Sequence, residues 1–355
     1  MNALSTYTPE RLRRLPLHEY YERSNIRLGE EGGWLLPKQF HNLADEVSLL
    51  EHGPALLDFS DHGLLSLEGK DAVDFLNRIS TNDFRNFSPG GSQQTVLTSE
   101  KGRAIDSIIV ADRHDHLLLI VSRGAQYEVK QWIEKFIIME DVNVVDRTGQ
   151  HLLFVLFNAL DATKILSGDN NYQAFRAHYY ENDVTFFIAD AEAGILGELH
   201  PVLNCQVGND AYNFFRIQHG IPCYKKEMDG EFNPLELNLW NQVSFSKGCY
   251  IGQEVIARLD TYKRIQRVLC RIRIDGPLLP EAKYPLTSGE KEIGKITSFM
   301  PDAYQIDSCV GLAIVRKEYA IVGSKHPAGN NAVTITIQHV FERIEDRNGN
   351  HNGSR

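Results

Sequence analysis

Residues 246–258 read Ser-Lys-Gly-Cys-Tyr-Ile-Gly-Gln-Glu-Val-Ile-Ala-Arg and place one thiol, Cys249, just before a predicted helix. Lys247 and the unpaired N–H groups at a helix start both favour the thiolate over the thiol. Gly248 and Gly252 lack a Cβ, so another backbone or a flat ligand can approach closely. We therefore expect a reachable thiol at the mouth of a ligand cleft. A lone cysteine is also commonly a small buried hydrophobe, which is the alternative interpretation.

The composition limits the class of protein. The 355 residues exceed the usual size of a single core, which predicts two or three domains. A net charge of −10 argues against a dedicated nucleic-acid binder. Five scattered cysteines without a Cys-x-x-Cys pair indicate reduced thiols, and neither a secretion signal nor a long apolar stretch is visible. We expect a cytosolic protein without a membrane segment or sequence-specific contact with nucleic acid.

Hydrophobic patterning divides the chain into two regions with different predicted secondary structure. Residues 64–76 predict a strand followed by a helix, and residues 152–166 repeat this order, with the helix over 159–166. This repeat predicts two related α+β layers. From Arg267 onward, short apolar runs separated by Pro and Gly predict a small antiparallel barrel or sandwich.

Several polar groups have more than one interpretation. Asp106 interrupts an apolar strand, which favours either a ligand contact or a structural hydrogen bond. Glu236 either accepts a hydrogen bond from an amino-substituted heterocycle or caps the surface. A basic cluster follows the Cys249 segment and either receives an anionic tail or forms a charged linker. Its members are Arg258, Lys263, Arg264 and Arg267.

The sequence lacks the motifs that several other reaction classes require. His114-Asp115-His116 is the most ligand-like group of histidines, but no further ligand stands at zinc-site spacing, so we predict a solvated turn and no metal site. The chain has no phosphate loop, no dinucleotide fingerprint and no Gly-x-Ser-x-Gly elbow. Nucleotide-driven chemistry and serine hydrolysis are therefore not predicted.

The run Lys247-Gly-Cys-Tyr-Ile-Gly-Gln-Glu resembles the signature of the YgfZ family, folate-binding proteins that support iron–sulfur enzymes. Other segments that resemble this family are Ser80-Thr-Asn-Asp, Lys101-Gly-Arg, Arg216-Ile-x-x-Gly-Ile-Pro, Asp229-Gly-Glu-x-Asn-Pro-Leu-Glu and Ala257-Arg-x-Asp-Thr-Tyr. YgfZ proteins are related to the glycine cleavage T-protein, an aminomethyltransferase that uses tetrahydrofolate.

The resemblance implies an α+β fold, a three-domain T-protein-like ring with ferredoxin-like α/β layers and a small C-terminal antiparallel β-barrel around a central folate pocket. The expected divisions are a flexible extension over 1–34, a first α+β domain from 35–60 and 146–262 that binds folate and carries Cys249, a second α+β domain over 61–145, a barrel over 263–344 and a disordered tail over 345–355.

Two departures from the related proteins concern the folate site. Relatives commonly show Arg-Ile-Glu-Ala-Gly where this chain has Arg216-Ile-Gln-His-Gly, so Gln218 replaces a carboxylate expected at the pterin edge, and a charge-assisted hydrogen bond is lost. The T-protein commonly has two adjacent acids where Asp106 is followed by Ser107, and its motif lacks the cysteine. The last two differences favour the YgfZ branch over aminomethyl transfer.

The first hypothesis is a folate-binding, YgfZ-like protein that supports assembly or repair of iron–sulfur clusters in client enzymes, including those that thiomethylate tRNA. The cofactor would be tetrahydrofolate or a one-carbon derivative, with Cys249 as the essential thiol and Lys247 as its catalytic partner. The resemblance assigns folate contacts to Asp106, Arg216, Gln218, Glu236, Tyr250, Gly252, Gln253 and Arg258. The alternatives are a tetrahydrofolate-dependent aminomethyl- or one-carbon-transferase and a non-catalytic folate-sensing scaffold that docks client proteins.

Overall fold

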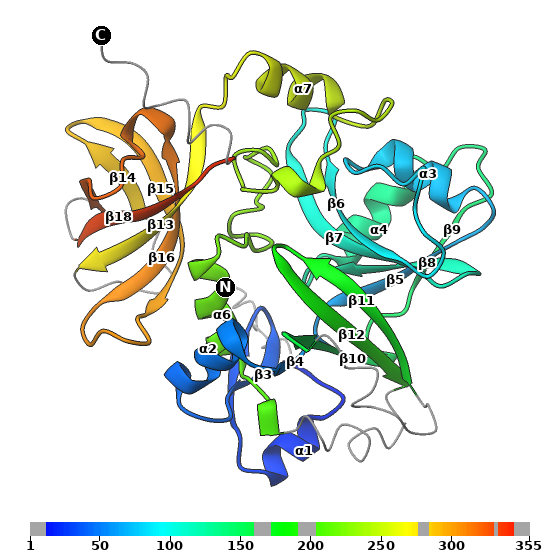
Figure 1. Ribbon diagram of the computed structural model, residues 1–355, viewed down its shortest axis with the longest axis horizontal. Helices are drawn as coiled ribbons and strands as arrows, with labels where there is room; N and C mark the ends of the chain where they lie inside the picture. Colours follow the sequence, from blue (N-terminus) through cyan, green and yellow to red (C-terminus); the bar gives the residue numbers. More distant parts are fainter. Residues whose placement is uncertain (1–11, 160–171, 191–203, 276–283, 330–332, 344–355) are drawn as a thin grey trace, which may run out of the picture.

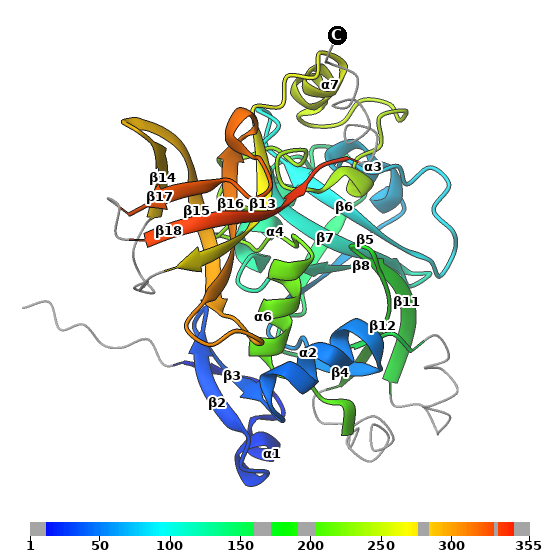
Figure 2. The same ribbon diagram turned by 60° about the vertical axis from the view of Figure 1, so that its left-hand side comes forward.

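The computed structural model of the protein describes residues 12–159, 172–190, 204–275, 284–329 and 333–343. Three lobes surround a central region, with a barrel on one side and a five-stranded sheet on the other (Figure 1). Helix α6 (Asn209–Gln218) lies near the middle of the molecule (Figure 2). No helix among the described residues is both long enough and apolar enough to cross a membrane.

The N-terminal segment is folded from residue 12 onward, which corrects the prediction of a flexible extension over residues 1–34. Its elements are β1 (Arg13–Arg14), α1 (His18–Arg23), β2 (Arg27–Glu31) and β3 (Trp34–Gln39), with strand order β1-β3-β2. Tyr21 and Trp34 anchor a small apolar cluster, and the hydroxyl of Tyr21 donates to Asp58 at 2.6 Å. A few apolar anchors therefore fix a segment whose average composition is polar. Residues 1–11 lie outside the described part of the chain.

The first sheet joins strands that are distant in sequence. It contains β4 (Ala55–Asp58), β10 (His151–Phe157), β11 (Tyr172–Tyr179) and β12 (Asn182–Asp190), paired antiparallel in the order β11-β12-β10-β4. Helix α2 (Leu43–His52) packs against α6. The N-cap of α2 is Asn42, whose side chain accepts a hydrogen bond from the N–H of Asp45. The helix predicted over residues 159–166 lies outside the described residues from 160 onward.

The second sheet is continuous in sequence. Its strands are β5 (Gly63–Glu68), β6 (Ser92–Thr98), β7 (Ala104–Asp112), β8 (His116–Val121) and β9 (Asn143–Asp146), in the order β6-β7-β8-β5-β9. Its helices are α3 (Ala72–Ile79) and α4 (Gln126–Glu134). Strand β11 of the first sheet contacts β6 and β7, so the two sheets share one apolar core. The predicted pair of α+β layers is therefore confirmed.

The C-terminal domain is a closed six-stranded barrel, which confirms the predicted architecture. Its strands are β13 (Arg267–Asp275), β14 (Tyr284–Ser288), β15 (Lys291–Pro301), β16 (Cys309–Arg316), β17 (Lys325–Ala328) and β18 (Val333–Phe341), and the 3-10 turn η3 (Lys317–Tyr319) follows β16. Inward-facing aliphatic side chains of these strands fill the barrel. The tail over 345–355 lies outside the described residues.

A buried ion pair connects the barrel to the rest of the chain. Arg216 on α6 is 3 % exposed and contacts Glu227 at 3.5 Å and the hydroxyl of Ser298 on β15 at 2.9 Å. Ser298 in turn donates to Glu227 at 2.7 Å. The segment between α6 and the barrel also contains the 3-10 turn η2 (Trp240–Gln242) and helix α7 (Gln253–Thr261).

Candidate functional site

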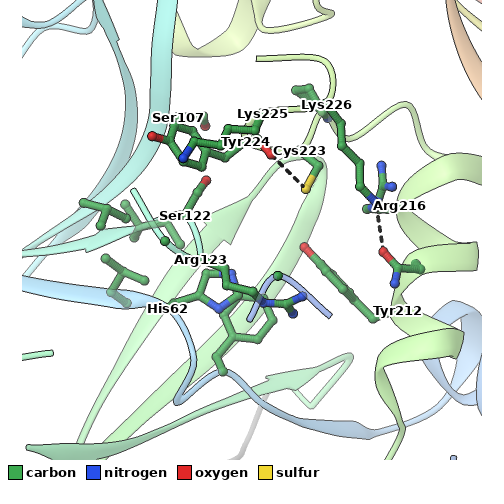
Figure 3. A pocket seen from close by; sticks show the side chains of 18 of the residues that line it. His62, Ser107, Ser122, Arg123, Tyr212, Arg216, Cys223, Tyr224, Lys225 and Lys226 are labelled. Carbon is green, nitrogen blue, oxygen red and sulfur yellow. Dashed lines mark hydrogen bonds between the residues drawn. The ribbon is translucent and has the colours of Figure 1, made fainter. Parts of the chain in front are cut away.

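A cavity of about 300 Å³ lies between the two sheets, α6 and the N-terminal segment (Figure 3). The turn after β2, the loop after β8, the inner face of α6 and the turn after Pro222 all contribute to its wall. This volume is at the lower end of the range for small-molecule sites. We refer to it as the central cavity.

An acidic and a basic side chain of the wall are paired with each other. Arg123 lies 3.3 Å from Glu31 and also contacts Asp61. Burial alone would raise the pKa of Glu31, but Arg123 and Lys38 lower it to about 2. Burial would likewise raise the pKa of Asp61, which Arg123 and His62 lower to about 2. Both carboxylates are therefore ionised acceptors at neutral pH.

Aromatic side chains supply the flat part of the wall. Phe59 stacks on His62 with ring centroids 3.9 Å apart, and Tyr212 contacts Phe59 edge-on at 5.5 Å. The hydroxyls of Tyr179 and Tyr212 are 2.5 Å apart, and that of Tyr180 donates to Ser107 at 3.3 Å. Burial raises the pKa of Tyr212 to about 12, so its phenol stays neutral. The wall thus offers ring faces together with neutral hydroxyl groups.

Asp106 does not line the cavity, whereas its neighbour Ser107 does. The Asp106 side chain is fully buried and accepts hydrogen bonds from the backbone N–H groups of Ser107 at 3.0 Å and Ser122 at 2.9 Å. Burial raises the pKa of Asp106 to about 7. Successive residues of a strand point to opposite faces, so the position open to a ligand is Ser107. The predicted ligand contact of Asp106 is therefore corrected to a structural hydrogen-bond role.

The turn after Pro222 carries a second thiol and two cations to the cavity. Cys223 is partly buried in the wall, and its backbone N–H donates to Glu227 at 2.9 Å. Lys225 and Lys226 are exposed and also line the cavity. The Arg216–Glu227 pair thus fixes the turn that presents these side chains. Of the predicted folate contacts, Arg216 is the one that lines this cavity.

The Cys249 segment, residues 246–258, lies elsewhere. Cys249 is exposed, so the thiol is reachable as predicted, but none of the described residues that line the central cavity belongs to this segment. The predicted position at the cavity mouth is therefore corrected. Helix α7 starts after Cys249 and lies at the outer end of the five-stranded sheet (Figure 1).

Lys247 has structural contacts in place of the predicted thiol contact. Its Nζ donates to the carbonyl oxygens of Asn77 at 2.6 Å and Ser80 at 2.9 Å, and also to that of Asn82. The carbonyl group of Asn77 lies in the last turn of α3 and those of Ser80 and Asn82 follow its end, where a cation is favoured. Burial lowers the pKa of Lys247 to about 8. The ammonium group therefore fastens the segment to α3.

Gly252 permits the close backbone approach that the sequence predicted. It has φ +83°, and a Cβ at this position would come within 2.7 Å of the carbonyl oxygen of Ser99. The hydroxyl of Thr98 donates to the carbonyl oxygen of Ile251 at 2.6 Å. The segment therefore rests on the turn between β6 and β7. Gly248 has open space at its Cβ position.

The remaining predicted contacts lie outside the central cavity. Gln218 accepts a hydrogen bond from Arg271 at 2.6 Å, which ties α6 to the barrel. Glu236 is buried, its pKa is raised by burial, and it lies 3.7 Å from Arg103. Tyr250 is buried beneath Lys247. Gln253 and Arg258 lie on α7, where Arg258 is exposed. These positions correct the predicted folate contacts of Gln218, Glu236, Tyr250, Gln253 and Arg258, and also that of Gly252.

Sequence reasoning missed the residues that build the cavity. Glu31 belongs to the segment predicted to be flexible, and Cys223 and Lys226, which follow the end of α6, carry no sequence-based prediction. A detectable signal was present in Cys223-Tyr-Lys-Lys, where a thiol adjoins two cations. No three His, Cys, Asp or Glu side chains within the described ranges are grouped as a metal site would require.

The cavity wall has the chemistry that a folate requires. Ring faces such as that of Tyr212 suit a flat heterocycle, and the hydroxyl groups of Ser107 and Tyr180 can accept hydrogen bonds from amino groups. Lys225 and Lys226 can attract the carboxylates of a glutamate tail. The residues present therefore fit the cofactor class, although they differ from those predicted.

Residues 17–170 match the family model described as the GCVT N-terminal domain. A chloroplastic protein of Arabidopsis thaliana named as a putative transferase is 26% identical over 343 residues, covering 90% of this chain and 79% of the relative. The aminomethyltransferase of Bacillus cytotoxicus is 26% identical over 346 residues, covering 88% of this chain and 93% of the relative.

A solved structure has the same architecture. The crystal structure of glycine cleavage system aminomethyltransferase T from Bartonella henselae covers 92% of this chain and 97% of its own, with a TM-score of 0.76 and 18% identity. At this identity the likeness shows the fold alone. The protein therefore has the T-protein-like fold and carries a match to the GCVT N-terminal domain in its first half.

Proposed function

We propose that the protein binds a tetrahydrofolate species in the central cavity and supports the assembly or repair of iron–sulfur clusters in client enzymes through Cys249. The observation that carries this proposal is the presentation of the thiol. Lys247 and Gly252 fasten the segment to the second sheet, yet Cys249 itself is exposed. A fixed, exposed thiol suits an exchange with a partner protein better than chemistry on a ligand inside the cavity.

The folate half of the proposal rests on the cavity wall. Ser107 and the tyrosine hydroxyls would hold the heterocycle, and Lys225 with Lys226 would hold the tail carboxylates. Bound tetrahydrofolate would supply a carrier for a one-carbon group. Calorimetric titration of tetrahydrofolate tests this half, with the Lys225→Gln/Lys226→Gln double variant expected to bind several-fold more weakly and with greater loss at low salt. The Lys101→Gln variant, outside the cavity, is the control.

Aminomethyl transfer is a second candidate, favoured by relatives named as aminomethyltransferases. One position in the wall weighs against it. The T-protein commonly has two adjacent acids at this position. Here the residue that faces the cavity is Ser107, and the side chain of Asp106 is fully buried on the opposite face of the strand. A ligand in the cavity thus meets a hydroxyl group where the T-protein would present a carboxylate. Turnover by the purified protein with tetrahydrofolate and an aminomethyl donor would support this candidate.

The thiol half is tested in cells that lack the native gene. Complementation with the Cys249→Ser variant should fail to restore the activity of iron–sulfur enzymes, read as tRNA thiomethylation and as the activity of a cluster-dependent dehydratase. The matched Cys309→Ser variant changes a thiol on β16 that lies outside the central cavity, and it should restore both activities to the wild-type level. Full activity with Cys249→Ser would overturn the role assigned to this thiol.

A further inference from the structure

A histidine and an aspartate form a pair in the turn between β4 and β5, at the wall of the central cavity. His62 lines this cavity (Figure 3), and its Nδ1 lies 2.8 Å from a carboxylate oxygen of Asp61. The imidazole also stacks on the buried ring of Phe59, with centroids 3.9 Å apart and planes 2° from parallel. The carboxylate and the aromatic ring together therefore fix the orientation of the imidazole.

The ionisation of Asp61 decides which imidazole nitrogen carries the proton. Burial would raise the pKa of Asp61, but Arg123 and His62 lower it to about 2, so the side chain is a carboxylate that can only accept hydrogen bonds. In the neutral imidazole, Nδ1 therefore carries the proton and donates to Asp61, and Nε2 keeps its lone pair. Nε2 has no partner among the described residues and is not sealed from solvent, so it is open to the cavity.

The other polar groups of the wall are poorer proton acceptors. Glu31 is ionised, but its oxygens already accept hydrogen bonds from Lys38 at 2.7 Å and Asn213 at 3.0 Å. The phenol of Tyr212 stays neutral, the arginine and lysine side chains have donors and no acceptor, and the thiol of Cys223 is a weak acceptor. Among the described residues that line the cavity, His62 thus provides the one uncommitted nitrogen lone pair.

We propose that His62 is a general base that takes a proton from water in the hydrolysis of a folate-bound one-carbon unit at the oxidation level of formate. This inference rests on the folate binding proposed above. The wall presents Ser107 where the T-protein commonly has an acid, so the imidazole is the group placed to accept a proton. A carboxylate behind an imidazole holds the tautomer that acts as a base and stabilises the imidazolium that forms, which is the role of Asp61.

The reaction balances without an oxidant or a reductant. The substrate is a methenyl group that bridges two nitrogen atoms of the folate and carries a positive charge. The water oxygen forms a bond to the methenyl carbon while one water proton moves to Nε2 of His62. The bond from this carbon to one nitrogen then breaks, the carbon–oxygen bond becomes the carbonyl of a formyl group, and the hydroxyl proton moves to that nitrogen. The imidazolium releases its proton to solvent, which restores the base.

Hydrolysis of 5,10-methenyltetrahydrofolate by the full-length protein tests the proposal, measured as the loss of the methenyl absorbance relative to the same buffer without protein. The wild type should hydrolyse the compound faster than buffer alone. His62→Gln cannot take up the proton and should lower the protein-dependent rate at least about 100-fold. His178→Gln is the matched control, because that imidazole also lies 3.1 Å from a carboxylate, that of Asp183, but outside the cavity, and it should keep the wild-type rate.

Chemical modification gives a second measurement, on the wild-type protein, in case His62→Gln does not fold. Diethyl pyrocarbonate acylates accessible imidazole nitrogens that carry no proton, and peptide mass spectrometry identifies the modified residues. His62 should be modified in the free protein and protected by saturating tetrahydrofolate. His178 is exposed outside the cavity and should be modified equally in both samples.

Calorimetric titration of tetrahydrofolate into the wild type separates this inference from the proposed function. Absence of binding would overturn both. Binding of tetrahydrofolate together with hydrolysis no faster than in buffer would overturn the role of His62 alone. An equal rate for folded His62→Gln, or modification of His62 that tetrahydrofolate does not reduce, would have the same consequence.

Discussion

The central cavity and the Cys249 segment are built in opposite ways. The cavity collects residues from Glu31 to Lys226 and pairs Glu31 with Arg123 inside its wall. The Cys249 segment is one continuous stretch that leaves its most reactive group exposed. This difference shows that a thiol can be displayed by a local motif, whereas a ligand cavity requires the whole fold. Four variants test how far the two regions are independent.

Arg216→Met should have the largest effect, because Glu227 would remain buried without its cation. Breaking a buried ion pair costs about 3–5 kcal/mol, so we expect this decrease in the free energy of unfolding, measured by urea denaturation. Lys226→Met is the control, since this exposed side chain should change stability by less than about 0.5 kcal/mol. A loss below about 1 kcal/mol for Arg216→Met would show that the pair does not hold the cavity together.

Asp106→Asn should change how stability depends on pH. The pKa of Asp106 is raised to about 7 in the folded protein, above the unfolded value near 4, so the folded state holds the extra proton between these pH values. The contribution of Asp106 is thus present below pH 4 and is lost as the pH rises through about 7.

The variant should therefore lose less stability than the wild type between pH 4 and pH 8, by an amount of the order of a few kcal/mol. The free energy of unfolding of both proteins is measured across this pH range. Asp58, whose pKa is also raised, is unchanged in the variant, so it contributes equally to both curves. Identical pH slopes for both proteins would contradict a buried, proton-holding Asp106.

Gly252→Ala should act on the Cys249 segment alone. The positive φ and the nearby carbonyl oxygen of Ser99 predict a loss of about 2 kcal/mol, together with faster proteolysis of this segment. Gly248→Ala is the matched control because its Cβ would meet open space, and we expect a change within about 0.5 kcal/mol. Equal losses in both variants would mean that Gly252 does not set the docking of the segment.

Cys249→Ser should have the smallest effect in the purified protein. The side chain is exposed and lines no part of the central cavity, so stability should change by less than about 0.5 kcal/mol. The affinity for tetrahydrofolate should remain within about twofold of the wild-type value. A larger loss of affinity, measured by calorimetry, would show that the thiol and the cavity form one site.

Local features were predictable from the sequence, and features that depend on tertiary packing were not. The exposed thiol, the tight approach at Gly252 and the C-terminal barrel follow from short-range patterns. The roles of Gln218 and Asp106 did not, because the sequence does not show which face of a helix or strand meets the cavity. The contribution of Glu31 depends on a fold that brings the N-terminal hairpin to α6.

The place of Glu31 has a practical consequence for recombinant work. The polar N-terminal sequence suggests a truncated protein that starts at residue 35. This protein would lack both Glu31 and Gly32 of the cavity wall. Arg123 would keep Asp61 but lose its second carboxylate, and Lys38 would lose its 2.7 Å partner. A shortened protein that fails to bind folate would therefore report on the truncation and not on the native molecule.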